Sequence, residues 1–544
     1  MKNIITVFLL LAGIQAYCQS KQSVVQHVIL IGIDGVSAEA FQYASTPFMD
    51  ELVAKGAVSL ITRGVMPTVS APNWATILSG AGPEQHGVTS NNWKLTNKRI
   101  SPTVKDSEGY FTSIFTLIRK QKPFANTCMF YDWDWLGTYI NKRTTDTMVY
   151  VKGTQAVTDA ASSYIIKNRP YFSFIYYGFP DETGHEKGFN TPAYYEAISE
   201  VDGEIRRLFD SVQYAGILQN TVFIITSDHG GLNFGHGGES MTELEVPWII
   251  SGPGIRKNIV LQNPNNHDNT APTIASLFGL KTPVEWTGVP MDEAFQRNNI
   301  YSKRIYNSYV PKVKCSVSNG IYLTPQPAIL SCKLANAEIH YTLDGSIPDI
   351  KSRKYQEPLL LATPITLTAV AIANNSVSEP IVVRVNIVKG ISSISLETAP
   401  SSKYPGQGVV GLLDGDKGTE DFTGSAWMGF EGTDFEATID FGRKRNLTGI
   451  GITVMYQPEN WIFLPSAVEF FTSTDGAEWQ PAGTADTGLT LGAIGGSPVT
   501  LLSTFPITSA RFVRVKAINT GVCPEGHPGA GKPAWLFVSE IVVN

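Results

Sequence analysis

The sequence of 544 residues has no low-complexity tract, no surplus of positive charge and no cysteine pair spaced like a zinc–thiolate site. Its formal net charge of −6 argues against a protein that coats nucleic acid, because such proteins normally carry a basic patch. Local basic side chains could still hold a phosphate, so polyanionic substrates stay open. The five cysteines are Cys18, Cys128, Cys315, Cys332 and Cys523. Metal ions would therefore have to be held by histidine and carboxylate groups.

No apolar run after the N-terminus is long enough for a membrane helix. The N-terminus has Lys2, an apolar stretch over residues 4–14, and small or polar residues around 16–20. This is the pattern of a secretory signal peptide, so we predict one over residues 1–20 and an exported protein that is periplasmic, extracellular or surface-associated. Cys18 also allows a lipoprotein, although the bulky residue before it fits a lipid-attachment box poorly.

Up to about residue 300, continuous apolar runs alternate with helical patterns. Three such runs are HVILIGI at 27–33, YFSFIYYG at 171–178 and TVFIIT at 221–226. Apolar strands separated by helices predict a mostly parallel sheet covered on both faces. Ligands of such sheets gather beyond the C-terminal ends of the strands. Acidic residues or histidines follow all three runs, so the pattern predicts a functional site at that edge.

The length predicts several domains, because one core rarely serves so long a chain. The predicted fold class is an α/β domain with a central mostly parallel sheet over 21–305, followed by two small all-β sandwiches. Short strands and glycine turns place the sandwiches at 311–388 and 391–544. Residues 92–150 are irregular and rich in aromatics. We interpret them as an insertion that shapes a substrate pocket, with extra scaffold packing as the alternative.

Five short segments in the first half of the chain carry polar side chains beside glycine or proline. They are Ile33-Asp34-Gly35, Pro67-Thr68-Val69-Ser70-Ala71-Pro72-Asn73, Pro180-Asp181-Glu182-Thr183-Gly184-His185, Ser227-Asp228-His229-Gly230 and Gly235-His236-Gly237-Gly238. A single aspartate after a strand is usually a helix cap or a turn residue. All five segments in this order match the ligand inventory of metal-assisted displacement at phosphorus, in which two ions about 4 Å apart clamp the attacking and leaving oxygens.

Zinc favours histidine nitrogen together with carboxylate oxygen, so two Asp/His sets are expected. The first predicted set is Asp181, His185 and His236, and the second is Asp34, Asp228 and His229, with Ser70 bridging towards the second. His267 is a reserve candidate for the third ligand of the first set. We prefer His236 because the glycines on both sides of it let the backbone approach a metal closely.

These segments, with Gly80 and His86-Gly87-Val88, resemble the alkaline phosphatase superfamily, and most closely its nucleotide pyrophosphatase/phosphodiesterase branch. The resemblance covers about the first 290 residues. It implies that one zinc is held by Asp34, Ser70, Asp228 and His229 and the other by Asp181, His185 and His236. Manganese or iron would accept the same ligands. His86 is expected to have a structural hydrogen-bonding role.

The resemblance makes Ser70 the nucleophile, which would form a covalent phospho-enzyme that water then breaks. Metal coordination would supply the activation that a serine hydroxyl lacks at its free pKa. Asn73 matches the asparagine that donates a hydrogen bond to a non-bridging phosphate oxygen. A neutral amide there suits a diester, with its single negative charge. A sulfatase is disfavoured, because the arginine that follows the proline in those relatives is replaced by Asn73 and Trp74.

The two C-terminal modules resemble accessory domains of exported enzymes. Residues 311–388 resemble the small β-sandwich found beside bacterial glycosidases, through the segment Ile339–Ser346, and would serve as a spacer. Cys315 and Cys332 fall in this module and could form a disulfide after export, with two free thiols as the alternative. Residues 391–544 resemble a discoidin-like, carbohydrate-binding module. The supporting residues include Leu413-Asp414-Gly415, Trp427 and Ile439-Asp440-Phe441-Gly442. In it, Trp461 is a candidate for stacking on a sugar, and Asp414 with Glu540 is a candidate calcium site.

Together these patterns predict an exported two-metal phosphoric ester hydrolase, foremost a type I phosphodiesterase, attached to glycan by its C-terminal module. The alternatives are an alkaline phosphatase-type monoesterase and an inactive glycan-binding adhesin. The sequence leaves the leaving group open among nucleotides, glycerophosphodiesters, phospholipid head groups and glycan-linked phosphates. It also leaves open the metal identity, the glycan ligand, the oligomeric state and the lipidation of Cys18.

Overall fold

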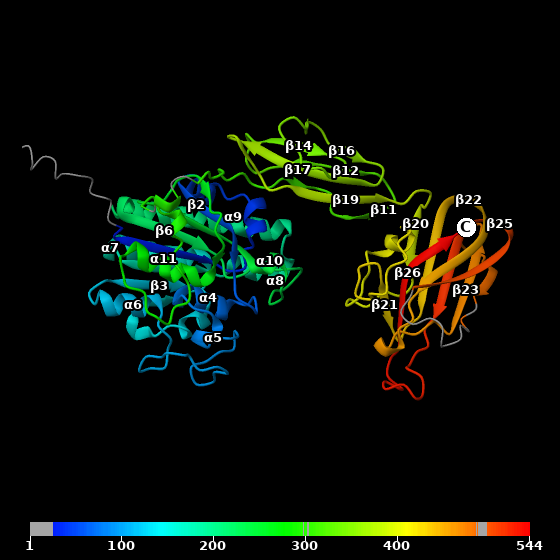
Figure 1. Cartoon of the computed structure of the whole chain (residues 1–544), viewed down its shortest axis with the longest axis horizontal. Helices are drawn as coiled ribbons and strands as arrows, with labels where there is room; N and C mark the ends of the chain where they lie inside the picture. The colour runs from blue at the N-terminus through cyan, green and yellow to red at the C-terminus, as the bar shows by residue number, and fades with distance from the viewer. Residues whose placement is uncertain (1–24, 298, 302–303, 486, 488–497) are drawn as a thin grey trace, which may run out of the picture. The chain divides into compact units, whose positions relative to one another are not determined.

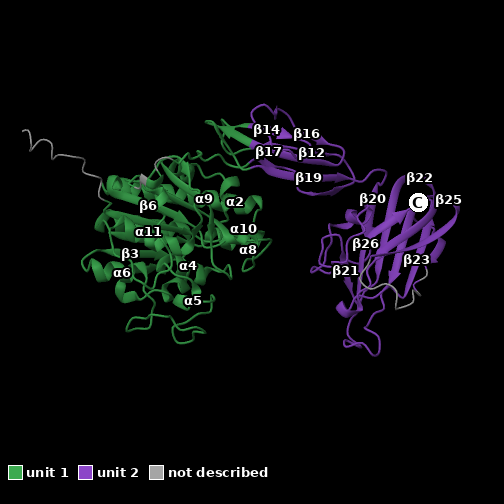
Figure 2. Cartoon of the chain, in the orientation of Figure 1, with its two compact units in different colours: residues 1–312, 332–338, 371–379 green, residues 313–331, 339–370, 380–544 purple. Residues whose placement is uncertain are grey.

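The computed structural model describes all residues except 1–24, 298, 302–303, 486 and 488–497 (Figure 1). The predicted signal peptide and Cys18 therefore lie outside the described residues. By contacts the chain divides into two compact units (Figure 2). The first contains residues 1–312, 332–338 and 371–379, and the second contains 313–331, 339–370 and 380–544. Within the described part of the chain, no helix has the length and apolar character needed to cross a membrane.

The first unit is built on a nine-stranded sheet in the order β4-β3-β5-β1-β6-β7-β2-β8, with β9 paired to β2. The strands are β1 (His27–Ile33), β2 (Gly56–Arg63), β3 (Thr127–Tyr131), β4 (Thr147–Tyr150), β5 (Phe172–Tyr177), β6 (Thr221–Thr226), β7 (Glu245–Ser251), β8 (Ile259–Val260) and β9 (Asn265–Asn266). The central strand β1 pairs in parallel with β5 and β6, whereas β7 runs antiparallel to both β6 and β2. The predicted mostly parallel sheet is confirmed.

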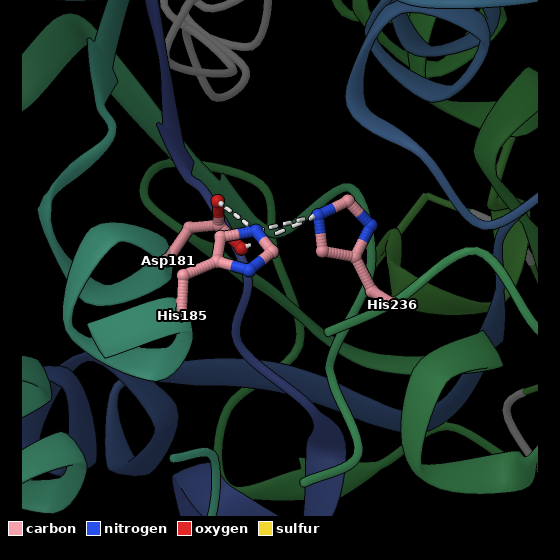
Figure 3. Close-up of side chains that lie close together, drawn as sticks. All are labelled: Asp181, His185 and His236. Atoms are coloured by element: carbon pink, nitrogen blue, oxygen red, sulfur yellow. Dashed lines mark hydrogen bonds and ion pairs between the residues drawn. The ribbon is translucent and has the colours of Figure 1, made fainter. Parts of the chain in front are cut away.

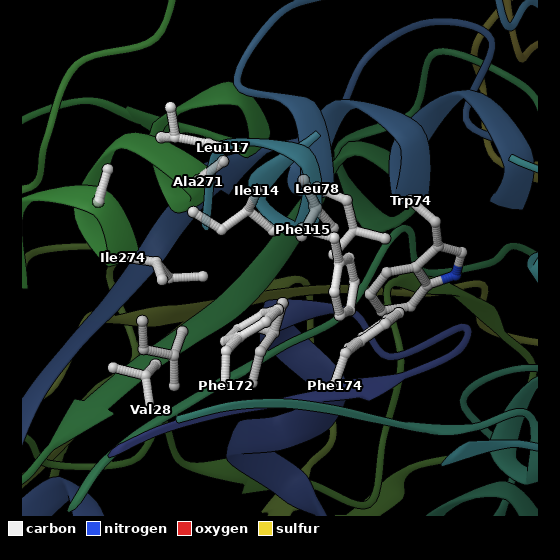
Figure 4. Close-up of a cluster of buried hydrophobic side chains, with 14 of the residues drawn as sticks. Val28, Trp74, Leu78, Ile114, Phe115, Leu117, Phe172, Phe174, Ala271 and Ile274 are labelled. Atoms are coloured by element: carbon white, nitrogen blue, oxygen red, sulfur yellow. The ribbon is translucent and has the colours of Figure 1, made fainter. Parts of the chain in front are cut away.

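Helices cover both faces of this sheet. They are α2 (Ala38–Tyr43), α3 (Pro47–Ala54), α4 (Ser70–Ser79), α5 (Pro83–His86), α6 (Ile114–Gln121), α7 (Thr154–Asn168), α8 (Phe179–Lys187), α9 (Pro192–Tyr214), α10 (Met241–Leu244) and α11 (Thr270–Leu277). Alternate residues of β1 point to opposite faces, so Val28 lies in one core with Trp74 and Ile274 (Figure 4), and Ile31 lies in the second core with Val201. The apolar residues of β1 are therefore all buried, on one face of the sheet or the other.

Residues 92–150 do not form an insertion outside the sheet. They contribute α6, the edge strand β4 and its neighbour β3, which pairs in parallel with β4 on one side and with β5 on the other. Phe115 and Met129 from this segment belong to the main core. These elements therefore belong to the scaffold, and a pocket-shaping role for the rest of the segment stays a prediction. The sequence pattern misled because β3 and β4 have only five and four residues, too few to show a period.

The rest of the chain is β structure, as predicted. The first sandwich has β11 (Gly320–Tyr322), β14 (Glu338–Thr342), β15 (Arg353–Lys354), β17 (Ile365–Ala373), β18 (Ser376–Val377) and β19 (Ile381–Ile387) in one sheet, with the pairs β10 (Lys314–Cys315)/β13 (Leu330–Ser331) and β12 (Gln326–Ala328)/β16 (Leu359–Leu361). The second has β20 (Ser393–Leu396), β21 (Met428–Glu431), β22 (Phe435–Val454), β23 (Ala467–Ser473), β24 (Gln480–Ala485), β25 (Val499–Ile518) and β26 (Trp535–Val543). Cys315 and Cys332 are free thiols, so the disulfide alternative is not realised.

Lys333 is a buried cation within the first unit. Its ammonium donates to the Phe41 carbonyl at 2.8 Å, to Thr46 Oγ1 at 2.9 Å and to Asp50 Oδ1 at 2.9 Å, and lies 4.3 Å from the centre of the Phe41 ring. Burial raises the pKa of Asp50 and lowers that of Lys333, so each depends on the other for its charge. Segment 332–338 is in this way fixed to the helices that follow β1.

Replacing Lys333 by Met should destabilise the first unit by about 3 kcal/mol, because breaking a buried ion pair leaves an uncompensated charge. The matched control is Lys55→Met at the C-terminal end of α3, the helix that carries Asp50. It removes an exposed ion pair with Glu51 and should cost about 0.5 kcal/mol or less. Urea denaturation of the full chain measures both effects. Equal shifts for the two variants would contradict the buried-pair interpretation.

Candidate metal centre

Asp34, Asp228 and His229 meet beyond the C-terminal ends of two adjacent strands. Gly32 of β1 faces Thr226 of β6, so continuing the parallel register by two residues brings Asp34 beside Asp228. One ligand atom of each of the three side chains lies within 4.8 Å of the others. His229 Nε2 is 3.1 Å from Asp228 Oδ2 and 3.6 Å from Asp34 Oδ1. We call these three residues the buried ligand set.

The buried ligand set has the electrostatics of a cation site. Burial raises the pKa of Asp34 well above its ordinary value, and repulsion from Asp228 and Asp181 adds to this effect. Burial and Asp181 likewise raise the pKa of Asp228. Asp34 Oδ1 and Asp228 Oδ2 are buried without a hydrogen-bond partner. Two carboxylate oxygens without hydrogen bonds beside a histidine nitrogen fit a divalent cation. Such an ion would compensate the negative charges of the carboxylates, which are unfavourable when buried.

Asp181, His185 and His236 form a second set, the outer ligand set (Figure 3). His236 Nε2 lies 3.1 Å from His185 Nε2 and 3.7 Å from Asp181 Oδ1, and His185 Nε2 lies 3.4 Å from Asp181 Oδ2. Asp181 and His185 were expected on a loop at a strand end. They instead sit on α8, where a spacing of four residues puts them on one helix face.

All three histidines of the two sets use Nδ1 for a backbone carbonyl. Nδ1 of His185, His229 and His236 donates to the carbonyls of Phe234, Gly230 and Thr68, each at 2.9 Å. This leaves every Nε2 as the ligand atom. Hydrogen bonding to Asp181 raises the pKa of His185 to about 9, while burial lowers the pKa of His236 to about 4. A cation bound here would therefore displace a proton from His185.

The two ligand sets lie side by side. The rings of His229 and His236 are stacked with centroids 3.7 Å apart and an interplanar angle of 19°. A side chain on Gly35, between the sets, would approach Asp181 Oδ1 to 2.8 Å, so only glycine fits there. The structure thus brings together all six predicted Asp and His ligands.

Ser70 begins helix α4 and is 6% exposed. Its Oγ lies 3.2 Å from His229 Nε2. This nitrogen accepts a hydrogen bond from the hydroxyl, because Nδ1 carries the ring hydrogen. The expected nucleophile therefore contacts the same nitrogen that faces the buried ligand set. The predicted bridging position of Ser70 agrees with this geometry.

Asn73 does not have the geometry of the expected phosphate donor. It is fully buried, its Nδ2 donates to the carbonyls of Val69 at 2.9 Å and Val65 at 3.2 Å, and its Oδ1 accepts from Val65 N and from His267 Nδ1. Asn73 thus closes the loop before α4. This correction arises because spacing alone did not reveal that the loop's own carbonyls would bind the amide.

Asn91 is a site residue that sequence reasoning missed. Its Oδ1 accepts the Ala71 N–H at 2.8 Å, which places the amide beside the residue next to Ser70. No strand or helix pattern flanks Asn91 in the sequence, so only the folded chain reveals it. His267 contacts Asn73 and is absent from the outer ligand set, and His86 bonds Thr76 Oγ1 and Val88 N as a structural residue.

The candidate C-terminal residues lie in the second unit. Glu540 Oε1 accepts the Gly415 N–H at 3.2 Å, while Oε2 is buried without a partner, and burial raises the pKa of Glu540 to about 8. Burial also raises the pKa of Asp414. Trp461 is half-buried, and its ring meets that of His527 edge to face with centroids 6.3 Å apart. Part of the Trp461 ring is therefore used in packing within the module.

Comparison with known proteins supports the resemblance. Residues 28–239 match the type I phosphodiesterase / nucleotide pyrophosphatase family, 317–383 the chitobiase/β-hexosaminidase C-terminal domain, and 397–527 the F5/8 type C domain. The chain therefore has a nucleotide pyrophosphatase/phosphodiesterase-type domain of the alkaline phosphatase superfamily. Its C-terminal part is a discoidin-like F5/8 type C domain.

The relatives match over this first domain. Ectonucleotide pyrophosphatase/phosphodiesterase family member 3 of Bos taurus is 27% identical over 37% of this chain and 24% of its own length. Family member 5 of Homo sapiens is 26% identical over 42% of this chain and 50% of its own. The chain thus spans a quarter to a half of these curated relatives. The solved structure of murine ectonucleotide pyrophosphatase/phosphodiesterase 5 covers 47% of this chain and 96% of its own, with 17% identity and a TM-score of 0.41.

Asp132, directly after β3, supports the outer ligand set. Its Oδ1 accepts the N–H of Gly178, the N-cap of α8, at 2.8 Å. Burial raises the pKa of Asp132 to about 7, and Glu182 adds repulsion. The folded chain therefore binds this proton more tightly than the unfolded chain, and the associated stability is lost as the pH rises towards 7.

An Asp132→Asn variant keeps the acceptor oxygen but cannot ionise. Its melting temperature should rise relative to the wild type between pH 5 and pH 8, by an amount that reflects up to about 4 kcal/mol for a shift of about three pKa units. Thermal unfolding of the metal-free full chain in chelator checks this. Asp134→Asn, an exposed neighbour, is the control. Parallel pH profiles for all three proteins would refute the assignment.

Proposed function

We propose that this protein is an exported phosphoric diester hydrolase that uses two divalent ions, foremost zinc, and Ser70 as its nucleophile. One observation carries the proposal: the buried and outer ligand sets lie side by side, and Ser70 Oγ contacts His229, whose ring stacks on His236 of the other set. The ions would supply charge neutralisation of the phosphoryl oxygens and activation of the hydroxyl. The N-terminal sequence pattern supports export.

The chain's own residues account for the covalent steps. Ser70 Oγ attacks phosphorus and loses its proton to solvent, because His229 Nε2 would be occupied by the ion, and the bond from phosphorus to the leaving oxygen breaks, with the leaving oxygen taking a proton from solvent. A water then attacks the phosphoserine, and the P–O bond to Ser70 breaks to restore the hydroxyl. Asn91, held by the Ala71 N–H, takes the role first assigned to Asn73: its Nδ2 donates to a non-bridging oxygen.

A diester suits the charges of the site. In the described part of the chain, the ion pairs of the two ligand sets involve only histidine and aspartate. A diester brings one negative charge, whereas a monoester dianion would need more compensation. The intact ligand sets also disfavour the inactive adhesin. We further propose that the discoidin-like module binds glycan, with Trp461 as a contact, and that Asp414 and Glu540 hold calcium.

The full chain should hydrolyse bis-p-nitrophenyl phosphate at least about tenfold faster than p-nitrophenyl phosphate at equal concentration. The reason is the single negative charge that the site must accept. Release of p-nitrophenol measures both rates. A clear preference for the monoester would establish the alkaline phosphatase-type alternative, and glycan binding without turnover of either ester would establish the adhesin.

Ser70→Ala should lower the diesterase rate about 10³-fold or more, because loss of a nucleophile removes the covalent route. Ser79→Ala, at the other end of α4, is the matched control: it is equally buried, bonds the Ala75 carbonyl, and should keep the wild-type rate. Steady-state rates with zinc present decide the point. Full activity in Ser70→Ala would refute the nucleophile.

A further inference from the structure

The two carboxylate oxygens of Asp34 have different surroundings. Oδ2 accepts the hydroxyl of Tyr176 and, at 3.2 Å, the indole N–H of Trp74. Oδ1 is buried, has no hydrogen-bond partner and faces His229 Nε2 at 3.6 Å. Oδ2 is therefore fixed by two hydrogen bonds, whereas Oδ1 remains available to bind a cation.

Both donors are fixed in place by packing. Trp74 is fully buried and Tyr176 is 2% exposed, and their rings meet edge to face with centroids 5.3 Å apart. The Trp74 ring fills the space above Gly32, where an added Cβ would come within 2.5 Å of it. Tyr176 lies opposite that same glycine in the pairing of β1 with β5. Neither ring can follow a rotation of the Asp34 carboxylate.

Asp228, the second carboxylate of the buried ligand set, is held differently. Its Oδ1 accepts the backbone N–H of Gly35 at 3.1 Å, while Oδ2 has no hydrogen-bond partner and lies 3.1 Å from His229 Nε2. Its orientation therefore follows from the backbone next to β1. Asp34 depends instead on two side chains from two other elements, the strand β5 and the helix α4.

We propose that Trp74 and Tyr176 are positioning residues that hold Asp34 as a one-oxygen ligand of the ion in the buried ligand set. This inference rests on the proposed two-metal function. Trp74 stands four residues after Ser70 on α4, so one rigid helix carries both the nucleophile and a donor that orients the ligand. The position of Ser70 is thereby tied to the orientation of Asp34.

The test uses Tyr176→Phe and Trp74→Phe in the full chain, each of which keeps a ring and removes a donor. After removal of metal by chelator, zinc is titrated in competition with a chromophoric chelator, and the bound ions are counted. We expect each variant to bind one of its two zinc ions about 10- to 100-fold more weakly and the other unchanged, because outer partners of metal ligands have effects of this size.

Two matched controls exist for lost donors in buried rings. Tyr177→Phe removes the hydroxyl of the next residue on β5, which bonds Thr158 Oγ1 on the opposite face. Trp248→Phe removes an indole N–H that donates to Thr270 Oγ1, also at 3.2 Å. Both controls should bind two zinc ions as the wild type does. Circular dichroism checks that each variant is folded. If Trp74→Phe does not fold, the zinc titration of Tyr176→Phe alone decides the proposal.

Undiminished binding of both ions in Tyr176→Phe would overturn the proposal, as would equal losses in Tyr177→Phe. Failure of the proposed function gives a different result: a wild type that binds two zinc ions and hydrolyses no phosphate ester. The ion counts then still decide whether Trp74 and Tyr176 position Asp34.

Discussion

Mutual repulsion among buried aspartates is the constraint on which the first unit depends. Asp34 and Asp228 are within 2% of full burial, and both feel the charge of Asp181. Leaving such charges uncompensated in a protein interior costs several kcal/mol for each ion. The fold nevertheless holds them together, through the pairing of β1 with β6 and the start of α8 beyond β5. The proposed divalent cations would compensate this cost.

The parallel sheet explains why the ligands could be found in the sequence. Each of the strands β1, β5 and β6 is an unbroken apolar run, and its end is marked by the first polar residues after it. The order β5-β1-β6 makes these three ends neighbours, so Asp34, Asp181 and Asp228 must gather there. The grouping of the six candidate Asp and His ligands was predictable because their positions follow from strand ends and from histidines beside glycine, features that a single sequence displays.

The surroundings of these ligands were not predictable in the same way. Asn73 was given the phosphate contact because it stands near Ser70 in the sequence, yet its amide binds carbonyls of its own loop, and it is Asn91 that accepts the Ala71 N–H beside Ser70. Lys333 binds Asp50 of α3, which lies 283 positions earlier in the chain. β3 and β4 are too short for a readable period and looked like an insertion. In each case the partner is set by tertiary packing, which no local pattern records.

The role that Asn73 does have links the loop before α4 to the outer ligand set. Its amide binds the carbonyls of Val65 and Val69 and so fixes the loop that contains Thr68. The Thr68 carbonyl accepts from His236 Nδ1, and Thr68 Oγ1 donates to the Gly238 carbonyl. The orientation of His236 therefore depends on the same loop that presents Ser70. A change in that loop would move Ser70 and His236 together, and would so couple the proposed nucleophile to the proposed outer metal site through backbone hydrogen bonds.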